Sequence, residues 1–255
     1  MKKLRFTLIT CLLMALAMPV IQSCLNDWND NDYNNTSLTI GTLKIIEGKN
    51  YYFNLDEGGK MYPGDTTYVH NYSLVDGQRV FIHFQLLSES VTGYDYNAQI
   101  YRIENILTKN IIPLTEATAD SIGNDPINAT DIWIAGGCLN IQYQLYYSPN
   151  ADKRHMLNLV TNETSGTSTS DENYVDLGFR HNAYNDMKQE LGWGVVSFKL
   201  DNIANQTKGK KGLKVHVNTI YDGERIITID FQTTTNQSKN EIKNHLQVSS
   251  SQLSF

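Results

Sequence analysis

Hydrophobic and polar residues alternate with a period of two along the first half of the chain, which is the pattern of half-buried β-strands. In the clearest case Val80, Ile82 and Phe84 fall on one face. Five stretches are predicted to be strands: residues 38–46, 50–55, 60–62, 79–87 and 94–107. Their lengths, with a long connection between the third and the fourth, predict a small closed barrel of the OB type over residues 38–112.

The second half of the chain has regularly spaced short strands, which follow a predicted linker at residues 113–125. Seven segments separated by regular turns are predicted to be strands: 127–135, 139–148, 155–162, 174–181, 194–201, 213–221 and 224–232. Gly136-Gly137 and Asp222-Gly223 each separate two of them and predict tight hairpins. The sequence therefore predicts an antiparallel β-sandwich over residues 126–232 and an all-β chain.

The first 23 residues have the order of a secretory signal peptide. Basic residues at positions 2, 3 and 5 precede an apolar stretch that is too short for a stable membrane span. Ser23 and Cys24 then resemble the cleavage site of a bacterial lipoprotein, where the cysteine is acylated and becomes the new N-terminus. Cleavage is expected between Ser23 and Cys24, and lipid on Cys24 is expected to attach the protein to the membrane.

The segment after Cys24 is acidic and rich in asparagine. Residues 24–37 are expected to form a tether, and residues 233–255 a polar tail that need not pack. Acidic residues directly after the lipidated cysteine resemble an export signal of some Gram-negative anaerobes, so we expect the protein on the outer membrane, facing the cell exterior. A calcium loop starting at Asp27 is not expected, because Asp32 occupies its glycine position and Leu38 its glutamate position.

Removal of the leader changes the charge of the protein. The complete chain has 21 basic and 27 acidic residues and a net charge of −6. The leader carries three basic residues and no acidic one, which leaves 18 basic and 27 acidic residues and a net charge of −9. The barrel region, with six basic and eight acidic residues, lacks the cationic track that a nucleic acid requires, so no nucleic-acid partner is expected.

Cysteine and histidine positions argue against disulfide and metal chemistry. Cys11 lies in the leader and Cys24 carries lipid, so Cys138 has no disulfide partner and is expected to be a buried, inert thiol. The six histidines include no pair at the short spacing of a metal site, and neither a metal nor a cofactor is expected. His83 and His216 lie within predicted strands, where outward-facing imidazoles are expected.

The chain lacks the common sequence motifs of catalysis. It has neither a Gly-x-Ser-x-Gly elbow nor a Walker-type phosphate loop. Acidic pairs such as Asp171-Glu172 fall in a predicted loop, whereas a glycosidase holds its two carboxylates rigidly apart. No catalytic residue is expected, and the protein is interpreted as a binding or protective module. A hydrolase whose residues meet only in the folded chain is the alternative.

One dense group of polar side chains follows a predicted strand. Its members are Arg180, His181, Asn182, Tyr184 and Asp186. A strand end with such side chains is a candidate binding patch. The structural alternative is favoured: Arg180 and Asp186 would tie the loop to the next strand, with Trp193 packed beneath.

Tyrosine is abundant, with 15 residues, and suggests a second kind of partner. Five tyrosines of the barrel region could stack on sugar rings: Tyr51, Tyr52, Tyr94, Tyr96 and Tyr101. Strand alternation places about half of them in the core. Recognition of a surface glycan is therefore kept as an alternative to a protein partner.

Two short motifs predict O-glycosylation of an exported protein. They are Asp65-Thr66-Thr67 and Asp120-Ser121-Ile122, both in predicted loops, with Thr66 and Ser121 as acceptors.

Several blocks of the sequence resemble the NigD-like lipoproteins. Besides the leader, they are Tyr52-x-x-Leu55-Asp56-x-Gly58, Asp76-Gly77-Gln78-Arg79-Val80, Ile106-Leu107-Thr108-Lys109, the run from Ser121 to Ile127, the run from Phe179 to Tyr184, and the run from Gly192 to Phe198. The resemblance extends to about Phe231 and implies an N-terminal OB domain and a C-terminal β-sandwich. A bacteriocin accessory or immunity role is implied only by the bacteriocin-associated gene cluster after which the family is named. The resemblance brings no catalytic residues.

Overall fold

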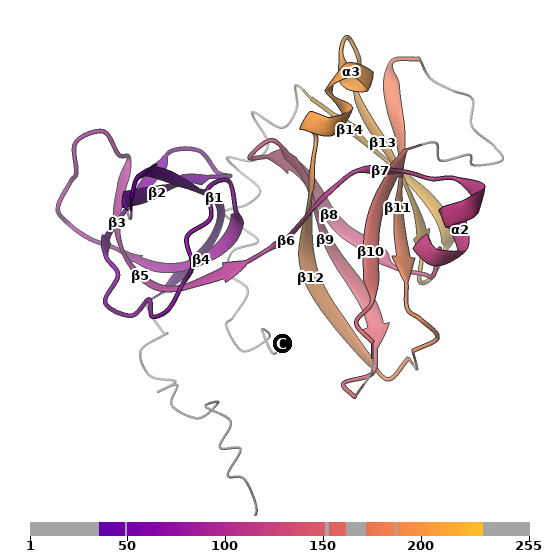
Figure 1. The fold of residues 1–255 in the computed structure, drawn as a ribbon, viewed down its shortest axis with the longest axis horizontal. Helices are drawn as coiled ribbons and strands as arrows, with labels where there is room; N and C mark the ends of the chain where they lie inside the picture. Colours follow the sequence, from indigo (N-terminus) through magenta and orange to yellow (C-terminus); the bar gives the residue numbers. More distant parts are fainter. Residues whose placement is uncertain (1–35, 49, 151–152, 162–171, 187, 232–255) are drawn as a thin grey trace, which may run out of the picture. The chain divides into compact units, whose positions relative to one another are not determined.

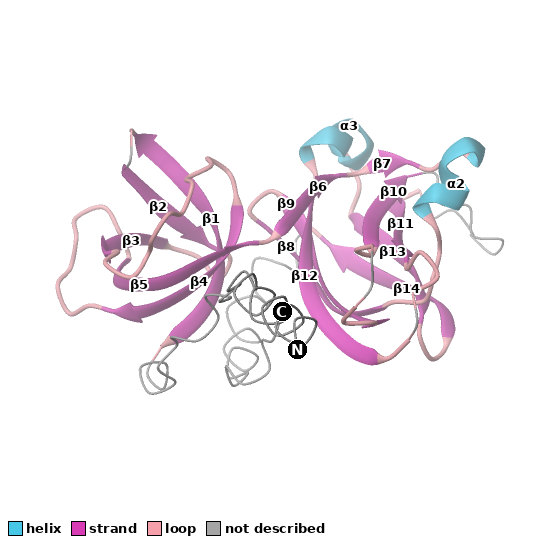
Figure 2. Ribbon diagram, turned by 60° about the horizontal axis from the view of Figure 1, so that its bottom comes forward, coloured by secondary structure: helices cyan, strands magenta, loops and turns pink. Residues whose placement is uncertain are grey.

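The computed structural model describes residues 36–48, 50–150, 153–161, 172–186 and 188–231, and strands dominate them (Figure 2). The strands are β1 Ser37–Glu47, β2 Asn50–Leu55, β3 Lys60–Asp65, β4 Arg79–Leu86, β5 Tyr96–Asn105, β6 Leu107–Asn110, β7 Ile112–Pro113, β8 Asn128–Ala135, β9 Cys138–Tyr147, β10 Met156–Thr161, β11 Tyr174–Asn182, β12 Glu190–Lys199, β13 Gly212–Thr219 and β14 Gly223–Asp230. The helical pieces are α2 Glu116–Ile122, the 3-10 turn η2 Asp201–Ile203 and α3 Ala204–Thr207. The predicted all-β class is confirmed.

The first five strands form a closed barrel in the order β1-β2-β3-β5-β4, with β4 pairing back to β1 (Figure 1). This is the predicted OB-like barrel. Strand β1 pairs with both β2 and β4 at Gly41, which lies opposite Leu55 and Val80. A Cβ atom at Gly41 would lie 2.8 Å from the backbone oxygen of Asn54, so the absence of a side chain allows the close approach of β2.

Alternate residues of these strands fill the barrel interior. Phe53, Ile82 and Ile100 are fully buried there. The connection between β3 and β4 covers the same core, because Val69 and Leu74 pack against it. The burial of these apolar side chains is the main favourable term for the barrel.

The later strands form two further sheets. The first sheet has the order β14-β13-β11-β10-β7 and the second β6-β12-β9-β8. One hydrophobic core includes residues of both sheets, for example Leu159 and Phe179 from the first and Ile141 and Phe198 from the second. This is the predicted β-sandwich, and β8–β9 and β13–β14 are the two predicted hairpins.

The sandwich is not wholly antiparallel, which corrects the sequence prediction. The pairs β7–β10, β6–β12 and β11–β13 are parallel. β11 and β13 run parallel because β12, which lies between them in the chain, belongs to the other sheet. β6 and β7 come from the segment that leaves the barrel, and each adds to the edge of a different sheet.

The expected segment boundaries also differ from the structure. Residues 107–113 pair with sandwich strands, whereas the barrel was expected to extend to residue 112. The expected linker at residues 113–125 contains α2, whose Ile122 is buried. Hydrophobic alternation alone could not separate β5 from β6, because a single residue lies between them.

The expected leader, the cleavage site at Ser23 and Cys24, most of the tether and the polar tail lie outside the described residues. Among the residues that are described, no helix is long and apolar enough to cross a membrane.

Candidate functional site

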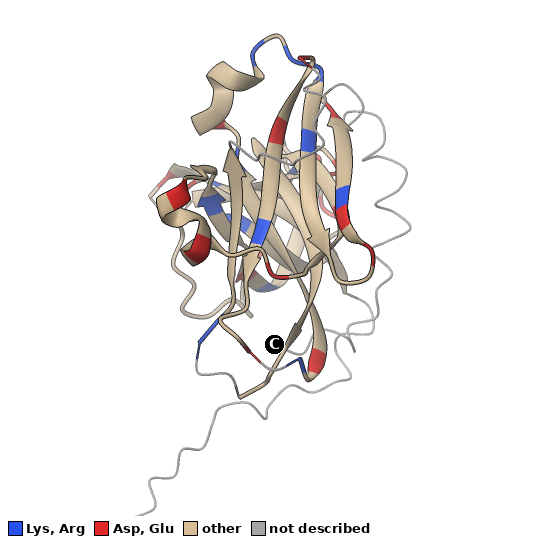
Figure 3. Ribbon diagram, turned by 90° about the vertical axis from the view of Figure 1, so that its right-hand side faces the viewer, with Lys and Arg blue, Asp and Glu red and all other residues tan. Residues whose placement is uncertain are grey.

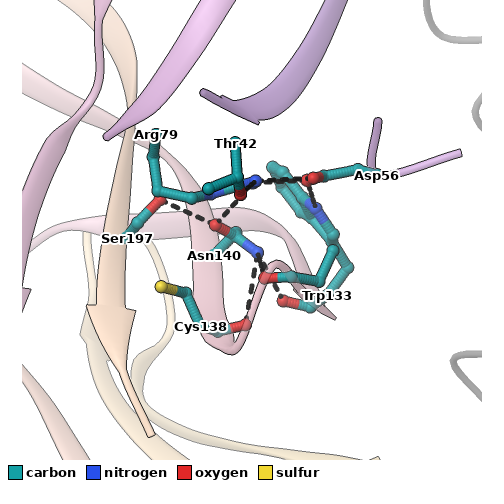
Figure 4. A network of polar contacts seen from close by, with 8 residues as sticks. Thr42, Asp56, Arg79, Trp133, Cys138, Asn140 and Ser197 are labelled. Carbon is teal, nitrogen blue, oxygen red and sulfur yellow. Dashed lines mark hydrogen bonds and ion pairs between the residues drawn. The ribbon is translucent and has the colours of Figure 1, made fainter. Parts of the chain in front are cut away.

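A buried polar network connects the barrel with the β8–β9 hairpin of the sandwich (Figure 4). Arg79 at the start of β4 donates from both terminal nitrogens to the carboxylate of Asp56, with a distance of 2.6 Å for Nη1. Nη2 also donates to Oδ1 of Asn140 at 3.1 Å, and Asp56 accepts from the indole nitrogen of Trp133 at 2.9 Å. Ser197 donates to the same Asn140 oxygen at 2.7 Å.

The ion pair in this network is almost completely removed from solvent. The side chain of Arg79 is 0% exposed and that of Asp56 is 4% exposed. A buried charge is tolerated when its hydrogen-bonding groups have partners, and here they come from both domains. Sequence reasoning did not single out this network, although Asp56 and Arg79 stand within two of the blocks that carry the family resemblance.

Cys138 begins β9 beside this network. The thiol is buried, and burial raises its pKa above the ordinary value, an effect that the nearby Arg79 opposes. A protonated, inaccessible thiol is a poor nucleophile.

The predicted group at residues 180–186 forms the end of β11 and the loop after it. Asn182 donates to the carbonyl of Ser121 at 2.9 Å and accepts from the amide of Tyr184 at 2.8 Å. The amide of Ala183 donates to Asp125 at 2.7 Å. These contacts fix the loop against α2 and the segment that follows it. The ammonium nitrogen of Lys153 lies 3.3 Å from the ring centre of Tyr184.

His181 and Asp186 join a chain of hydrogen bonds through His155, which the sequence analysis did not connect with them. Nδ1 of His181 lies 3.2 Å from the carbonyl oxygen of Pro126, and its Nε2 lies 2.9 Å from Nδ1 of His155. Nε2 of His155 lies 2.9 Å from Asp186, which also accepts from the amide of Ser148 at 2.7 Å. Asp186 therefore ties the loop to His155 and to the residue that directly follows β9.

The carbonyl oxygen of Pro126 determines the tautomer of His181. A carbonyl oxygen can only accept, so Nδ1 of His181 carries a proton, and its Nε2 then accepts from His155. The second nitrogen of His155 faces the carboxylate of Asp186. The hydrogen-bond pattern therefore assigns the tautomer of His181 that carries its proton on Nδ1. Burial, and then the neighbouring His155, lowers the pKa of His181, in agreement with its neutral form.

His216 lies on the outer face of the first sheet, as expected, but it is buried rather than open to solvent. Its Nε2 is 3.0 Å from Asp176 and its Nδ1 is 3.1 Å from Glu224. Both ring nitrogens are therefore used by protein partners. His83 makes a comparable contact with Glu104 at 3.2 Å on the barrel.

The structure separates the five predicted tyrosines into different environments. Tyr51 packs against the barrel core and meets Phe53 edge-on, and burial raises its pKa. Tyr101 stacks against Tyr68 with ring centres 5.0 Å apart. Tyr96 is exposed, whereas Tyr52 and Tyr94 are partly exposed and in mutual contact.

Tyr52 and Tyr94 have a third partner that the sequence analysis missed. Tyr62 on β3 lies 5.1 Å from Tyr94, measured between ring centres. We call Tyr52, Tyr62 and Tyr94 the tyrosine face. The signal that could have identified Tyr62 was its place in a short predicted strand at residues 60–62, with Met61 turned to the core.

The two expected acceptors of O-glycosylation lie in different settings. Thr66 directly follows β3 and is partly exposed. Ser121 is exposed but lies in α2 rather than in a loop, and its hydroxyl donates to the carbonyl of Thr118 at 2.9 Å.

Charge and metal-ligand side chains form no concentrated site in the described part of the chain. Basic and acidic residues are interspersed along the strands that face the viewer in Figure 3. No group of three or more His, Cys, Asp or Glu residues could hold a metal ion among the residues that the structure describes.

Two family models match the chain. The model of the NigD-like N-terminal OB domain matches residues 40–106, and the model of the NigD-like C-terminal beta sandwich domain matches residues 110–231. The two matches are separated by residues 107–109, which lie in β6. No curated protein matches the chain.

Solved structures with the same fold come from Bacteroides and Parabacteroides species. A protein of unknown function from Bacteroides vulgatus is 28% identical, with a TM-score of 0.66, and the match covers 77% of this chain and 90% of that chain. A protein described as toxin-related from Parabacteroides distasonis is also 28% identical, with a TM-score of 0.64 and coverage of 82% and 98%.

A third structure, described as a NigD-like immunity protein from Bacteroides caccae, is 19% identical, with a TM-score of 0.54 and coverage of 77% and 92%. At that identity the likeness concerns the fold. The two family models together span nearly all of the described residues in the order barrel then sandwich, and the chain therefore belongs to the NigD-like family.

Proposed function

We propose that this protein is a non-enzymatic binding module, attached by lipid at Cys24 to the outer membrane and exposed on the cell surface. The order of basic, apolar and small residues before Cys24 supports the anchor. The acidic tether after Cys24 supports exposure on the outside. The folded domains would present a ligand surface at the end of this tether.

The observation that carries the binding role is the tyrosine face of the barrel. Its three partly exposed rings lie on strands β2 and β3 and in the connection between β4 and β5. OB barrels bind their ligands on the face of strands 2 and 3 and with the loop between strands 4 and 5. The tyrosine face therefore lies where this fold places its ligands.

A hydrolase is less well supported by the geometry. An acid or base must reach a substrate atom, either directly or through water. The His155, His181 and Asp186 group directs its ring nitrogens to one another, to Pro126 and to the carboxylate. These groups hold the loop together and are not presented to a ligand.

The protective part of the proposal follows from the family. The Bacteroides caccae protein is described as an immunity protein. A binding module on the cell surface would protect its cell by capturing an incoming toxin or by covering its receptor. We include bacteriocin immunity in the proposal as one use of the binding surface.

Protease treatment of intact cells, with Cys24→Ser as the matched variant, tests anchoring and exposure. We expect protease to degrade the native protein on intact cells. The Cys24→Ser protein should leave the membrane fraction and should not incorporate labelled fatty acid. A native protein that is fully protected from protease would contradict surface exposure, and a Cys24→Ser protein that stays with the membrane would contradict the lipid anchor.

A further inference from the structure

The tyrosine face is part of the outer surface of the barrel. Phe53 of β2 pairs with Met61 of β3, and both side chains are buried in the core. Because side chains alternate across a strand, their neighbours Tyr52 and Tyr62 point to the opposite, outer side. The ring of Tyr94 lies 5.8 Å from that of Tyr52 and 5.1 Å from that of Tyr62, so it meets both.

Two lysines accompany these rings. Lys44 of β1 pairs with Tyr52, and its neighbour Leu43 is buried, so Lys44 also points outward. The ammonium nitrogen of Lys60 lies 5.6 Å from the ring centre of Tyr52. The outer surface of β1, β2 and β3 therefore combines aromatic area with positive charge, although the barrel region as a whole is net acidic.

The side chains of this surface leave their polar groups unpaired among the described residues, although the backbone amide of Lys60 donates to the carboxylate of Asp95 at 2.7 Å. Within the described part of the chain, the hydroxyls of Tyr52, Tyr62 and Tyr94 make no hydrogen bond, and Lys44 and Lys60 make no ion pair. By contrast, Tyr72 on the same barrel donates from its hydroxyl to Asn105 at 2.5 Å. Three phenol groups and two ammonium groups thus remain available to a ligand beside the aromatic rings.

We propose that the tyrosine face, with Lys44 and Lys60, binds an oligosaccharide that carries carboxylate groups. A sugar ring packs its apolar C–H face on an aromatic ring, and its hydroxyls bond to phenol oxygens. The ammonium groups pair with carboxylates along the same chain. This inference rests on the proposed function of a surface binding module and adds the chemical class of its ligand.

A single-stranded nucleic acid is the other polymer that OB barrels bind through aromatic side chains. It presents a phosphate at every nucleotide and requires a continuous cationic groove. The barrel region has a net charge of −2, and two lysines beside three tyrosines suit a ligand with more widely spaced charges. The charge balance therefore favours the acidic sugar.

Calorimetric titration of the purified complete chain with an oligomer of galacturonic acid tests the proposal. We expect saturable binding that weakens as salt rises, because the lysines contribute through charge. Tyr52→Ala and Lys60→Gln should each weaken it roughly tenfold, the magnitude of one lost aromatic or charged contact. Tyr52→Phe should bind more tightly than Tyr52→Ala because it keeps the ring.

Two controls separate this site from other tyrosines and from misfolding. Tyr221 is 66% exposed in the β13–β14 turn, and Tyr221→Ala should bind as the native protein does. Thermal unfolding of each variant reports its fold, and Lys60→Gln changes an exposed side chain whose loss leaves the core intact.

Three results would overturn the proposal: no binding of the galacturonic acid oligomer, equal binding by Tyr52→Ala, or tighter binding of single-stranded oligothymidylate. Binding of a neutral galactose oligomer with the same affinity would overturn the role of the lysines. These failures are distinguishable from failure of the proposed function, because protease accessibility and fatty-acid labelling do not depend on the ligand.

Discussion

Arg79 illustrates how a single charged residue is accommodated in the interior. Its guanidinium group is buried and donates to Asp56, Thr42 and Asn140, of which the last belongs to the sandwich. Removing one partner of a buried ion pair is more harmful than losing an exposed pair, because the remaining charge stays in a medium of low dielectric constant. Nε of Arg79 has no partner among the described residues, so the group depends on its two terminal nitrogens.

Asp56→Asn should therefore lower the free energy of unfolding by about 3–5 kcal/mol, the usual cost of leaving a buried charge uncompensated. Urea denaturation measures the change. Arg102→Gln is the control, because Arg102 pairs with Glu104 while its own side chain is 48% exposed, and we expect a loss below about 1 kcal/mol. Equal losses in the two variants would contradict the account of the network.

His181 gives a prediction about pH. Its pKa is lowered in the folded protein, chiefly by burial, so the unfolded chain takes up a proton at a higher pH than the folded chain does. This contribution to stability is complete above the ordinary histidine pKa and is lost as pH falls below it. Urea denaturation from pH 8 to pH 5 should show a steeper decline for the native protein than for His181→Gln. Parallel declines would show that His181 is not the responsible group.

At the scale of elements, alternation along the chain predicted most strands and both hairpins. The parallel pairs were not predictable, because they depend on which sheet each strand joins. The contact of His155 with His181 connects the residue before β10 with β11 across 26 positions, and a search for short histidine spacing could not find it. The tyrosine face was found only in part, because Tyr62 stands in a strand of six residues that the sequence outlined as three.

The β8–β9 hairpin is the element whose tip reaches the barrel. A Cβ atom at Gly136 would lie 2.6 Å from Oγ1 of Thr42 and 2.7 Å from Nη1 of Arg79, whereas a Cβ atom at Gly137 would meet nothing within 4 Å. Both glycines have positive φ, so alanine is strained at either position. Gly136→Ala should be less stable than Gly137→Ala by about 1–3 kcal/mol, as overpacked sites are.

Thermal or urea denaturation of the two glycine variants makes this comparison directly. The shared backbone strain cancels in the difference, which leaves the contact with Arg79. Equal stability of the two variants would mean that a side chain at Gly136 does not clash with Thr42 and Arg79.

At the scale of the whole molecule, this protein combines a buried polar junction with a surface whose phenol and ammonium groups have no hydrogen-bond or ion-pair partner among the described residues. In the buried network, the charged groups of Asp56 and Arg79 pair with each other, and Arg79 also donates to Asn140. In the loop after β11, the carboxylate of Asp186 pairs with His155. The hydroxyls of the tyrosine face have no such partner among the described residues, and the proposal therefore assigns ligand binding to the barrel.

The most direct test of this assignment is capture of a ligand from an outer-membrane extract of the native cells. The immobilised complete chain is compared with Tyr52→Ala/Tyr62→Ala and with Tyr221→Ala. We predict that the native protein and Tyr221→Ala retain the same component and that the double variant does not. Retention of that component by all three proteins, or by none of them, would contradict the tyrosine face as the ligand-binding surface.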